Sequence, residues 1–354
     1  MKLTIDQNNK TKKFSKPNFV RKTIGRVRRL VPSFVVDSID YLAKIKNGNK
    51  YNHPYHNPSE NEYQPFFIVG SGRSGNTLLR KLLVENSEVV IPPEIPGLGN
   101  TIRCFSRYRG VEWSQCVEKT LGMFVAQANV SIETKDKEGG VIKYNLLYDL
   151  GLDFDHLKTK LSNLPSEQQA LSTIIAEIYT QYSINKTGKV LPWGDKTPWN
   201  VFHYARIKKV FPKARYVHMI RNGKDVVASY VSSLGEEKNI TVKDASYRWR
   251  DSVLMLRKSI GKIAKGCFLE IRYEDLVTNH NEISNKAIDF LNLTKKNSLY
   301  VLGNHDDTNM SHHKNLNLSI TRRSIGGFDY KLSNKDKALT LKIIKPYLKM
   351  YNYE

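Results

Sequence analysis

The sequence predicts an α/β protein in which a central parallel sheet is flanked by helices on both faces. Two observations lead to this prediction. Short apolar runs typical of buried strands alternate with segments of helical periodicity, and a glycine-rich turn joins the first such strand directly to a helix. A crossover helix returns the chain so that the next strand pairs in parallel, which places helices on the faces of the sheet.

The elements are predicted in chain order from their apolar residues and flanking turn residues. The first strand covers residues 66–69, an apolar run bounded by a proline and a glycine, and an apolar helix follows at 77–84. A short second strand is expected at 89–91. Residues 100–190 have mainly helical periodicity. Further strands are expected at 214–220 and 267–271, and further helices at 224–231, 282–291 and 335–350.

Residues 1–60 differ in composition from the rest and are predicted to be a basic N-terminal extension of a domain that spans 61–354. Ten lysines or arginines and one acid, Asp6, lie within the first thirty residues, and the pattern at 34–45 is that of a short amphipathic helix. Two interpretations stay open. The extension is either a solvated tail that leads into a packing helix, or an anchor that contacts an anionic surface such as a membrane interface.

The overall charge and composition narrow the functional classes. The 354-residue chain carries 56 Lys and Arg against 34 Asp and Glu, a formal net charge of +22, which attracts nucleic acid, anionic lipid, or sulfated and phosphorylated ligands.

Because the sequence lacks an apolar run of about 18 residues and an apolar signal-peptide core, we expect a soluble, cytoplasmic protein. Three scattered cysteines suit a reducing compartment. The pairs His53/His56 and His312/His313 are interpreted as surface histidines of polar loops, so no metal site is predicted.

A phosphate-binding loop is predicted at residues 70–77, where GSGRSGNT stands between the first strand and its helix. Glycines let the backbone turn with positive φ, so that amide groups converge on an anion, and the helix N-terminus adds partial positive charge. Asn76 stands where a P-loop nucleoside triphosphatase needs lysine, so a magnesium triphosphate is not the expected ligand. The residues expected to bind the ligand are Ser71, Gly72, Arg73, Ser74, Gly75, Asn76 and Thr77.

A second anion-binding pair is predicted after a later strand. Arg221 follows the strand at 214–220, at the carboxyl end where open α/β sheets bind ligands, and Ser229 lies about two turns into the next helix. A guanidinium suits a phosphate dianion because it offers paired N–H donors. If the loop folds back, the guanidinium of Arg221 and the hydroxyl of Ser229 meet on one anion.

Together these motifs resemble those of sulfotransferases that use 3′-phosphoadenosine-5′-phosphosulfate (PAPS), in particular the bacterial and tyrosylprotein branch. The loop at 70–77 is similar to the family's 5′-phosphosulfate loop, and Arg221 and Ser229 stand at the spacing of the pair that holds the 3′-phosphate. Further similarities are GDKTP at 194–198, RYEDL at 272–276 and SIGGF at 324–328. The resemblance covers roughly residues 65–354 and implies a three-layer P-loop-like fold with PAPS as donor.

The resemblance also extends the expected donor site. It implies that Tyr273 contacts the nucleotide. Gly327 and Phe328 replace the Arg-Trp usual in bacterial relatives, and the neighbouring Arg322 and Arg323 are therefore the expected contacts of this segment with the 3′-phosphate.

Three residues are predicted to carry the chemistry. Sulfuryl transfer needs a nucleophilic acceptor, in-line approach and stabilisation of charge on the bridging oxygen. Arg73 and Lys196 are the expected cations that stabilise the leaving diphosphate, and because they replace the Mg²⁺ of phosphoryl transfer, no metal is expected. Glu94, stiffened by flanking prolines, is the candidate base, since the resembling tyrosylprotein and glycan enzymes use a glutamate after this strand to take the acceptor's proton.

The sequence leaves the acceptor open among a glycan, a peptide tyrosine and a small metabolite with a hydroxyl or amine. Residues 100–190 are expected to form an insertion on the acceptor side, where Arg103, Arg107 and Arg109 suggest either an acidic acceptor or a solvated basic face. Two other functions compete with a sulfotransferase. A P-loop nucleotide kinase or NTPase is disfavoured by the missing lysine, and a basic nucleic-acid-binding protein does not explain the glycine loop, so no specific nucleic-acid partner is expected.

Overall fold

The computed structural model describes residues 51–58, 64–95, 97–128, 131–135, 141–145, 150–238, 240–296, 320 and 322–353. All of them fall in the unit Tyr51–Glu354. The basic segment 1–50 with its expected amphipathic helix, and the pair His312 and His313, lie outside the described residues. Within the described part of the chain, no helix has both the length and the apolar character needed to cross a bilayer.

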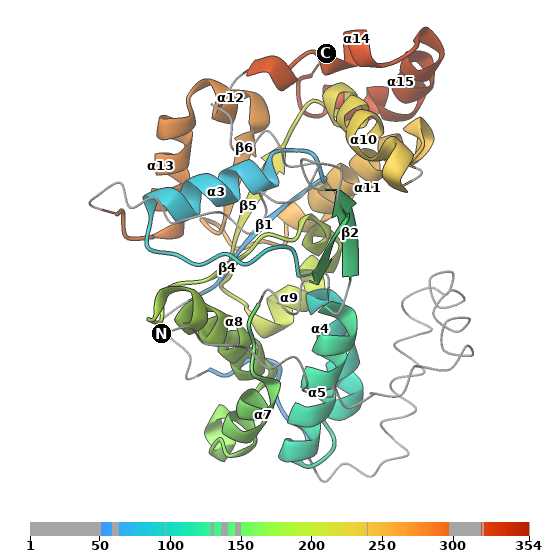
Figure 1. Ribbon diagram of the computed structural model, residues 1–354. Helices are drawn as coiled ribbons and strands as arrows, with labels where there is room; N and C mark the ends of the chain where they lie inside the picture. The colour runs from blue at the N-terminus through green and yellow to red at the C-terminus, as the bar shows by residue number, and fades with distance from the viewer. Residues whose placement is uncertain are drawn as a thin grey trace, which may run out of the picture. The chain divides into compact units, whose positions relative to one another are not determined.

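The described residues are organised around a four-stranded parallel sheet in the order β4-β1-β5-β6, which confirms the predicted fold class (Figure 1). Its strands are β1 (Phe66–Gly70), β4 (Gly194–Asp195), β5 (Arg215–Ile220) and β6 (Phe268–Arg272). Gly70 pairs with Met219 of β5, and Ile220 pairs with Arg272 of β6, so the carboxyl ends of these strands meet at one edge. The loops that follow the three strands share that edge, where open α/β sheets bind ligands.

Helices pack around the sheet (Figure 1). The α-helices are α3 (Asn76–Asn86), α4 (Leu98–Tyr108), α5 (Trp113–Ala128), α7 (Phe154–Ser162), α8 (Leu171–Thr187), α9 (Tyr204–Val210), α10 (Gly223–Lys238), α11 (Val242–Ile260), α12 (Tyr273–Thr278), α13 (His280–Leu291), α14 (Gly327–Lys331) and α15 (Asn334–Lys349). The 3-10 helices are η1 (Ser166–Gln168), η2 (Pro198–His203) and η5 (Arg322–Ser324).

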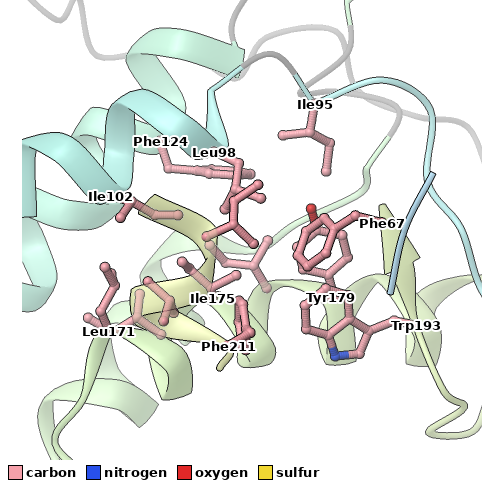
Figure 2. Packing of buried hydrophobic residues seen from close by; sticks show 14 of the residues in the cluster. Phe67, Ile95, Leu98, Ile102, Phe124, Leu171, Ile175, Tyr179, Trp193 and Phe211 are labelled. Atoms are coloured by element: carbon pink, nitrogen blue, oxygen red, sulfur yellow. The ribbon is translucent and has the colours of Figure 1, made fainter. Parts of the chain in front are cut away.

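The side chains of β1 alternate between two cores, one on each face of the sheet. Phe66 and Ile68 pack with α3 and α13, whereas Phe67 and Val69 pack with α4, α5 and α8. Figure 2 shows the second core, where the Trp193 ring stacks on that of Tyr179 with 4.0 Å between centroids. Helices on both faces give the three layers expected for the family that the sequence resembles.

One local prediction is wrong, and another is right in the main but omits a pair of strands. Residues 89–91 form no strand; Val90 makes only an isolated bridge with Trp193, because Pro92 and Pro93 follow at once and lack the N–H groups that would extend a ladder. The stretch 100–190 does contain α4, α5, α7 and α8, but it also contains the antiparallel hairpin β2 (Ser131–Lys135) and β3 (Val141–Asn145), which periodicity did not predict.

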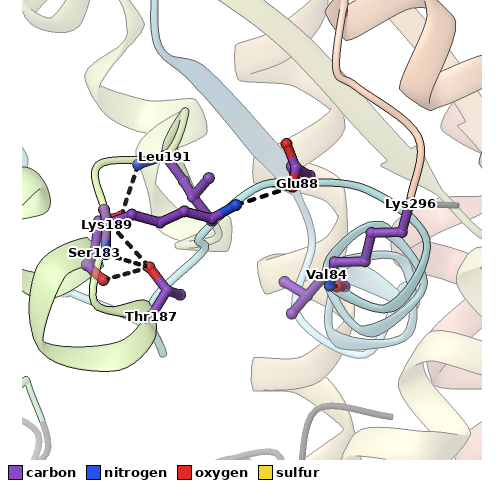
Figure 3. Close-up of polar contacts among 7 residues, drawn as sticks. All are labelled: Val84, Glu88, Ser183, Thr187, Lys189, Leu191 and Lys296. Carbon is purple, nitrogen blue, oxygen red and sulfur yellow. Dashed lines mark hydrogen bonds and ion pairs between the residues drawn. The ribbon is translucent and has the colours of Figure 1, made fainter. Parts of the chain in front are cut away.

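Contacts outside the sheet hold the segment that runs from α3 to these prolines (Figure 3). Lys189 Nζ lies 3.0 Å from Glu88 Oε1, and the Glu88 N–H donates to the carbonyl oxygen of Thr294 at 2.8 Å. Lys296 Nζ donates to the carbonyl oxygen of Val84 at 2.6 Å. The chain that leads to the predicted base is therefore fixed from two sides.

The prediction that His53 is a surface residue is also wrong. His53 is 8% exposed, and its Nε2 donates to the carbonyl oxygen of Val111 at 3.0 Å. Its ring meets that of Trp113 edge-on, 4.9 Å between centroids. His56 is half-buried, with Nδ1 3.1 Å from the carbonyl oxygen of Val210. Packing of residues 51–58 against the helical layer buries these rings, which a Pro- and Asn-rich sequence does not reveal.

Candidate functional site

The predicted phosphate loop joins β1 to α3, and aromatic rings pack directly against its backbone. Gly75 has a φ of 92° and Arg73 a φ of 65°, both in the left-handed region. A Cβ on Gly72 would lie 2.1 Å from the hydroxyl oxygen of Tyr230, and one on Gly75 would lie 2.5 Å from the ring of Tyr273. These contacts explain why glycine occupies both positions.

Asn76, which replaces the P-loop lysine, braces the loop from within. It is 3% exposed, and its Nδ2 donates to the carbonyl oxygen of Ser71 at 2.8 Å. The hydroxyl of Ser74 is buried and has no hydrogen-bond partner among the described residues. Because buried polar groups are normally paired, this hydroxyl fits a site that an anion completes.

Arg73, Ser229 and Arg221 come together beside the loop. Arg73 Nε donates to Ser229 Oγ at 3.2 Å, and Arg221 Nη1 donates to the carbonyl oxygen of Arg73 at 2.9 Å. The Arg221 guanidinium also lies over the Tyr273 ring, with 4.3 Å from Cζ to the ring centroid. The two motifs expected to hold opposite ends of a ligand thus share one edge of the sheet, with Arg73 rather than Arg221 bonded to Ser229.

Arg73 and Arg221 bring two positive charges close together beside the loop. Burial is the main cause that lowers the pKa of Arg73, and the nearby Arg221 lowers it as well. Since arginine stays protonated in proteins, the lowered pKa reflects an unfavourable burial of charge rather than loss of the proton. Arg221 Nε is buried and lacks a hydrogen-bond partner within the described residues. An anionic ligand at this edge would accept a hydrogen bond from Arg221 Nε and offset the buried positive charge.

Glu94 and Lys196 form an ion pair at the start of α3. Lys196 Nζ lies 3.2 Å from Glu94 Oε1 and 3.4 Å from Thr77 Oγ1. The side chain of Lys196 is fully buried, whereas that of Glu94 is 44% exposed. The carboxylate is held on one side and open to solvent on the other, which is the geometry of a group that can take a proton from an incoming molecule.

A long-range hydrogen bond brings this pair together. The Ile95 N–H donates to Thr197 Oγ1 at 2.9 Å, which joins the loop of the glutamate to the loop of the lysine. Asp195 accepts hydrogen bonds from Tyr179 at 2.6 Å and from Asn200 at 2.7 Å, and burial raises the pKa of Asp195 to about 6. The backbone next to the lysine is therefore anchored in the core.

Arg322 and Arg323 lie on η5, and their side chains are exposed. The carbonyl oxygen of the next residue, Ser324, accepts from Arg221 Nη2 at 2.5 Å. The structure therefore brings the backbone of this segment to the site and leaves both arginine side chains at the surface.

Sequence reasoning missed three residues that shape the site. Asp225 accepts two backbone N–H groups of the segment after η5, at 2.9 and 3.1 Å. The Tyr230 side chain hydrogen-bonds that of Ser71, and burial is the main cause that raises the pKa of Tyr230. Glu274 Oε1 accepts the N–H of residue 222 at 3.0 Å, and its Oε2 accepts the Tyr353 hydroxyl at 2.8 Å. Glu274 lies within the RYEDL segment at 272–276 and Tyr230 directly follows Ser229, whereas no predicted motif includes Asp225.

Comparison with known proteins gives a consistent result. The model of a family described as "Sulfotransferase family" matches residues 65–297. The sulfotransferase domain of the Synechococcus PCC 7002 olefin synthase shares 19% identity and a TM-score of 0.51, covering 83% of this chain and 98% of that chain. At this identity the likeness shows the fold. No curated protein sequence gives a significant match.

Two more distant structures have lower scores. The sulfotransferase domain from the curacin biosynthetic pathway shares 18% identity at a TM-score of 0.48, covering 82% of this chain and 98% of its own. A mouse sulfotransferase, SULT7A1, solved with PAP, shares 11% identity at a TM-score of 0.37, covering 81% of this chain and 89% of its own.

Proposed function

Because the chain belongs to the sulfotransferase family, we propose that it transfers a sulfuryl group from PAPS to a hydroxyl or amine of an acceptor. The observation that carries the proposal is the meeting of Arg73, Ser229 and Arg221 at the glycine loop after β1. Two guanidinium groups beside a glycine loop at one sheet edge suit a ligand that carries several negative charges. The Asn76 side chain bonds the loop's own backbone and carries no positive charge where a nucleoside triphosphatase has lysine. This supports PAPS as the ligand over a magnesium triphosphate.

The donor would be held by groups from three loops. In this proposal residues 71–77 bind the 5′-phosphosulfate, whereas Arg221 and Ser229 bind the 3′-phosphate. Tyr273, which already stacks on the Arg221 guanidinium, contacts the nucleotide. The exposed Arg322 and Arg323 add positive charge from η5.

Transfer would then use the pair at the start of α3. Glu94 takes the proton from the acceptor's hydroxyl or amine as that group forms its bond to sulfur. The bond from sulfur to the 5′-phosphate oxygen breaks, and Arg73 and Lys196 stabilise the negative charge that collects on this oxygen. The exposed carboxylate and the buried ammonium suit these two tasks, because one must meet the acceptor and the other must face the donor loop.

Calorimetric titration with 3′,5′-adenosine diphosphate (PAP) tests the donor assignment. We expect wild type to bind PAP, and Arg221→Ala to lose about tenfold or more in affinity, since a hydrogen bond to a charged group contributes about 1.5–3 kcal/mol. Arg215→Ala is the matched control, because Arg215 begins the same strand at the opposite edge of the sheet. Equal binding by wild type and Arg221→Ala, or a preference for Mg-ATP over PAP, contradicts the proposal.

A further inference from the structure

A group of nitrogen-bearing side chains lies where α4, η2 and α9 meet, outside the residues assigned above. The ring of His203, the last residue of η2, packs on α4 so closely that a Cβ on Gly99 would lie 2.2 Å from it. Arg206 Nη1 lies 3.0 Å from His203 Nδ1. Arg103 follows Gly99 by one helical turn on the same face of α4, and its charge acts on His203.

The hydrogen bond from Arg206 defines which nitrogen of the histidine carries its proton. A guanidinium can only donate, so His203 Nδ1 must accept, and the proton of the neutral ring is on Nε2. Burial lowers the pKa of His203 to about 4, and Arg206 and Arg103 lower it too. At neutral pH the group therefore presents two cations and one neutral N–H donor.

The Arg103 guanidinium has an unsatisfied donor. Its Nε is buried without a hydrogen-bond partner among the described residues. A buried donor beside a second cation costs free energy unless an acceptor satisfies it. The missing component of this group is thus a negatively charged acceptor of hydrogen bonds.

The same two elements lead from this group to the reacting residues. α4 begins at Leu98, shortly after Glu94, and η2 begins at Pro198, two residues after Lys196. A 3-10 helix rises about 2 Å per residue, so His203 lies roughly 10 Å along η2 from its start. Both elements that carry the group therefore begin within a few residues of Glu94 and Lys196 in the chain.

We propose that Arg103, His203 and Arg206 bind an oxyanion of the acceptor, a carboxylate, sulfate or phosphate, while the acceptor's nucleophile lies at Glu94. This inference rests on the proposed function. Of the two interpretations of the arginines on α4, an acidic acceptor or a solvated basic face, it favours the acidic acceptor. Arg103 supplies the unsatisfied donor, and Arg206 holds the histidine ring in the tautomer that donates from Nε2.

Thermal-shift titration of the full chain, saturated with PAP to occupy the donor loop, tests the subsite. Sodium sulfate is added at constant ionic strength set by sodium chloride, with parallel titrations of acetate and phosphate to identify the preferred oxyanion. We expect sulfate to stabilise wild type and to bind about tenfold more weakly to Arg103→Gln and Arg206→Gln. The control Lys119→Gln, which removes one exposed positive charge from α5, keeps the wild-type response.

Two results overturn the subsite: no stabilisation of wild type by any of the three oxyanions, or the wild-type response in both arginine variants. Each variant is first checked for its melting temperature in chloride, and if one fails to fold the other still gives the comparison. Failure of wild type to bind PAP counts against the donor assignment instead. Whether or not PAP binds, the difference in sulfate stabilisation between wild type and Arg103→Gln reports on the subsite.

Discussion

Glu94 reaches solvent while its partner Lys196 does not, and this difference separates their proposed roles. A buried ammonium needs its carboxylate partner, because an uncompensated buried charge is strongly unfavourable. The exposed carboxylate, in contrast, can exchange its proton with an incoming group. The two side chains therefore depend on each other. A substitution at Glu94 must leave an oxygen that still accepts a hydrogen bond from Lys196.

The change Glu94→Gln satisfies this condition, because the amide oxygen can still accept from Lys196 but cannot take a proton. We expect turnover to fall by about 10²–10⁴-fold, the usual contribution of a general base, while PAP affinity stays within about twofold of wild type. Turnover is measured as PAP release with an acceptor mixture on which wild type is active. Glu118→Gln on α5, which alters an exposed ion pair with Lys158, is the control. Wild-type turnover in Glu94→Gln contradicts the assignment of the base.

Asp195 gives a prediction about pH and stability. Its folded pKa, about 6, lies above its ordinary value, so the native state binds a proton more tightly than the unfolded state. The stabilisation from this proton is complete at about pH 4 and is lost as pH rises to about 6. In urea denaturation between these limits, the stability of wild type relative to Asp195→Asn should fall with rising pH. Parallel pH profiles of the two proteins contradict it.

At the scale of elements, the loop between β1 and α3 depends on helix α10, which contributes both Ser229 and Tyr230 to it. The hydroxyl of Tyr230 occupies the space where a side chain at Gly72 would stand, and Ser229 bonds Arg73 from the preceding position of the same helix. Because α10 also follows Arg221 in the chain, this helix sets the spacing between the loop and the second arginine.

The change Gly72→Ala tests this dependence, because its Cβ meets the Tyr230 hydroxyl at 2.1 Å. We expect a destabilisation of about 1–3 kcal/mol, the usual cost of overpacking, together with weaker PAP binding. The double variant Gly72→Ala/Tyr230→Phe should recover part of both losses, since it removes the oxygen that clashes. Thermal denaturation and calorimetry report the two quantities. A double variant no better than the single one contradicts this account of the contact.

The sequence predicts the loop more completely than the groups that support it. Residues 70–77 are recognisable because glycine spacing and a strand-to-helix context are local properties. Glu94 and Lys196 were predicted separately, but their contact depends on the bond from Ile95 to Thr197, which joins distant parts of the chain. Tyr230 was missed for a related reason: its role comes from packing against a glycine, and a sequence pattern records the glycine but not what fills its space.

At the scale of the whole molecule, the end of the described chain packs back onto the edge of the sheet that carries the proposed donor site. Arg272, at the end of β6, donates to the carbonyl oxygen of Tyr351, and its guanidinium lies 4.7 Å from the Tyr353 ring centroid. Tyr353 then bonds Glu274, which holds the backbone N–H next to Arg221. Residues 272–274 thus connect the final turn of the chain to the proposed 3′-phosphate site.

The change Tyr353→Phe removes the hydroxyl that bonds Glu274 and keeps the ring on Arg272. We expect a severalfold rise in the KM for PAPS with little change in kcat, because the loop that carries Arg221 loses one support while Glu94 and Lys196 are untouched. Tyr347→Phe, in α15, is the control. A fall in kcat at unchanged KM contradicts a positioning role for this contact.

The contact between Tyr353 and Glu274 has a consequence for biosynthesis. The glycine loop at 70–77 leaves the ribosome long before residue 353 is made, so the nascent chain carries this loop without the bond that supports Arg221. If nucleotide binds as proposed, a nascent chain that has not reached residue 353 should bind it severalfold more weakly than the folded protein. Stabilisation of the folding chain by nucleotide should therefore increase once this tyrosine has been added and has packed against Glu274.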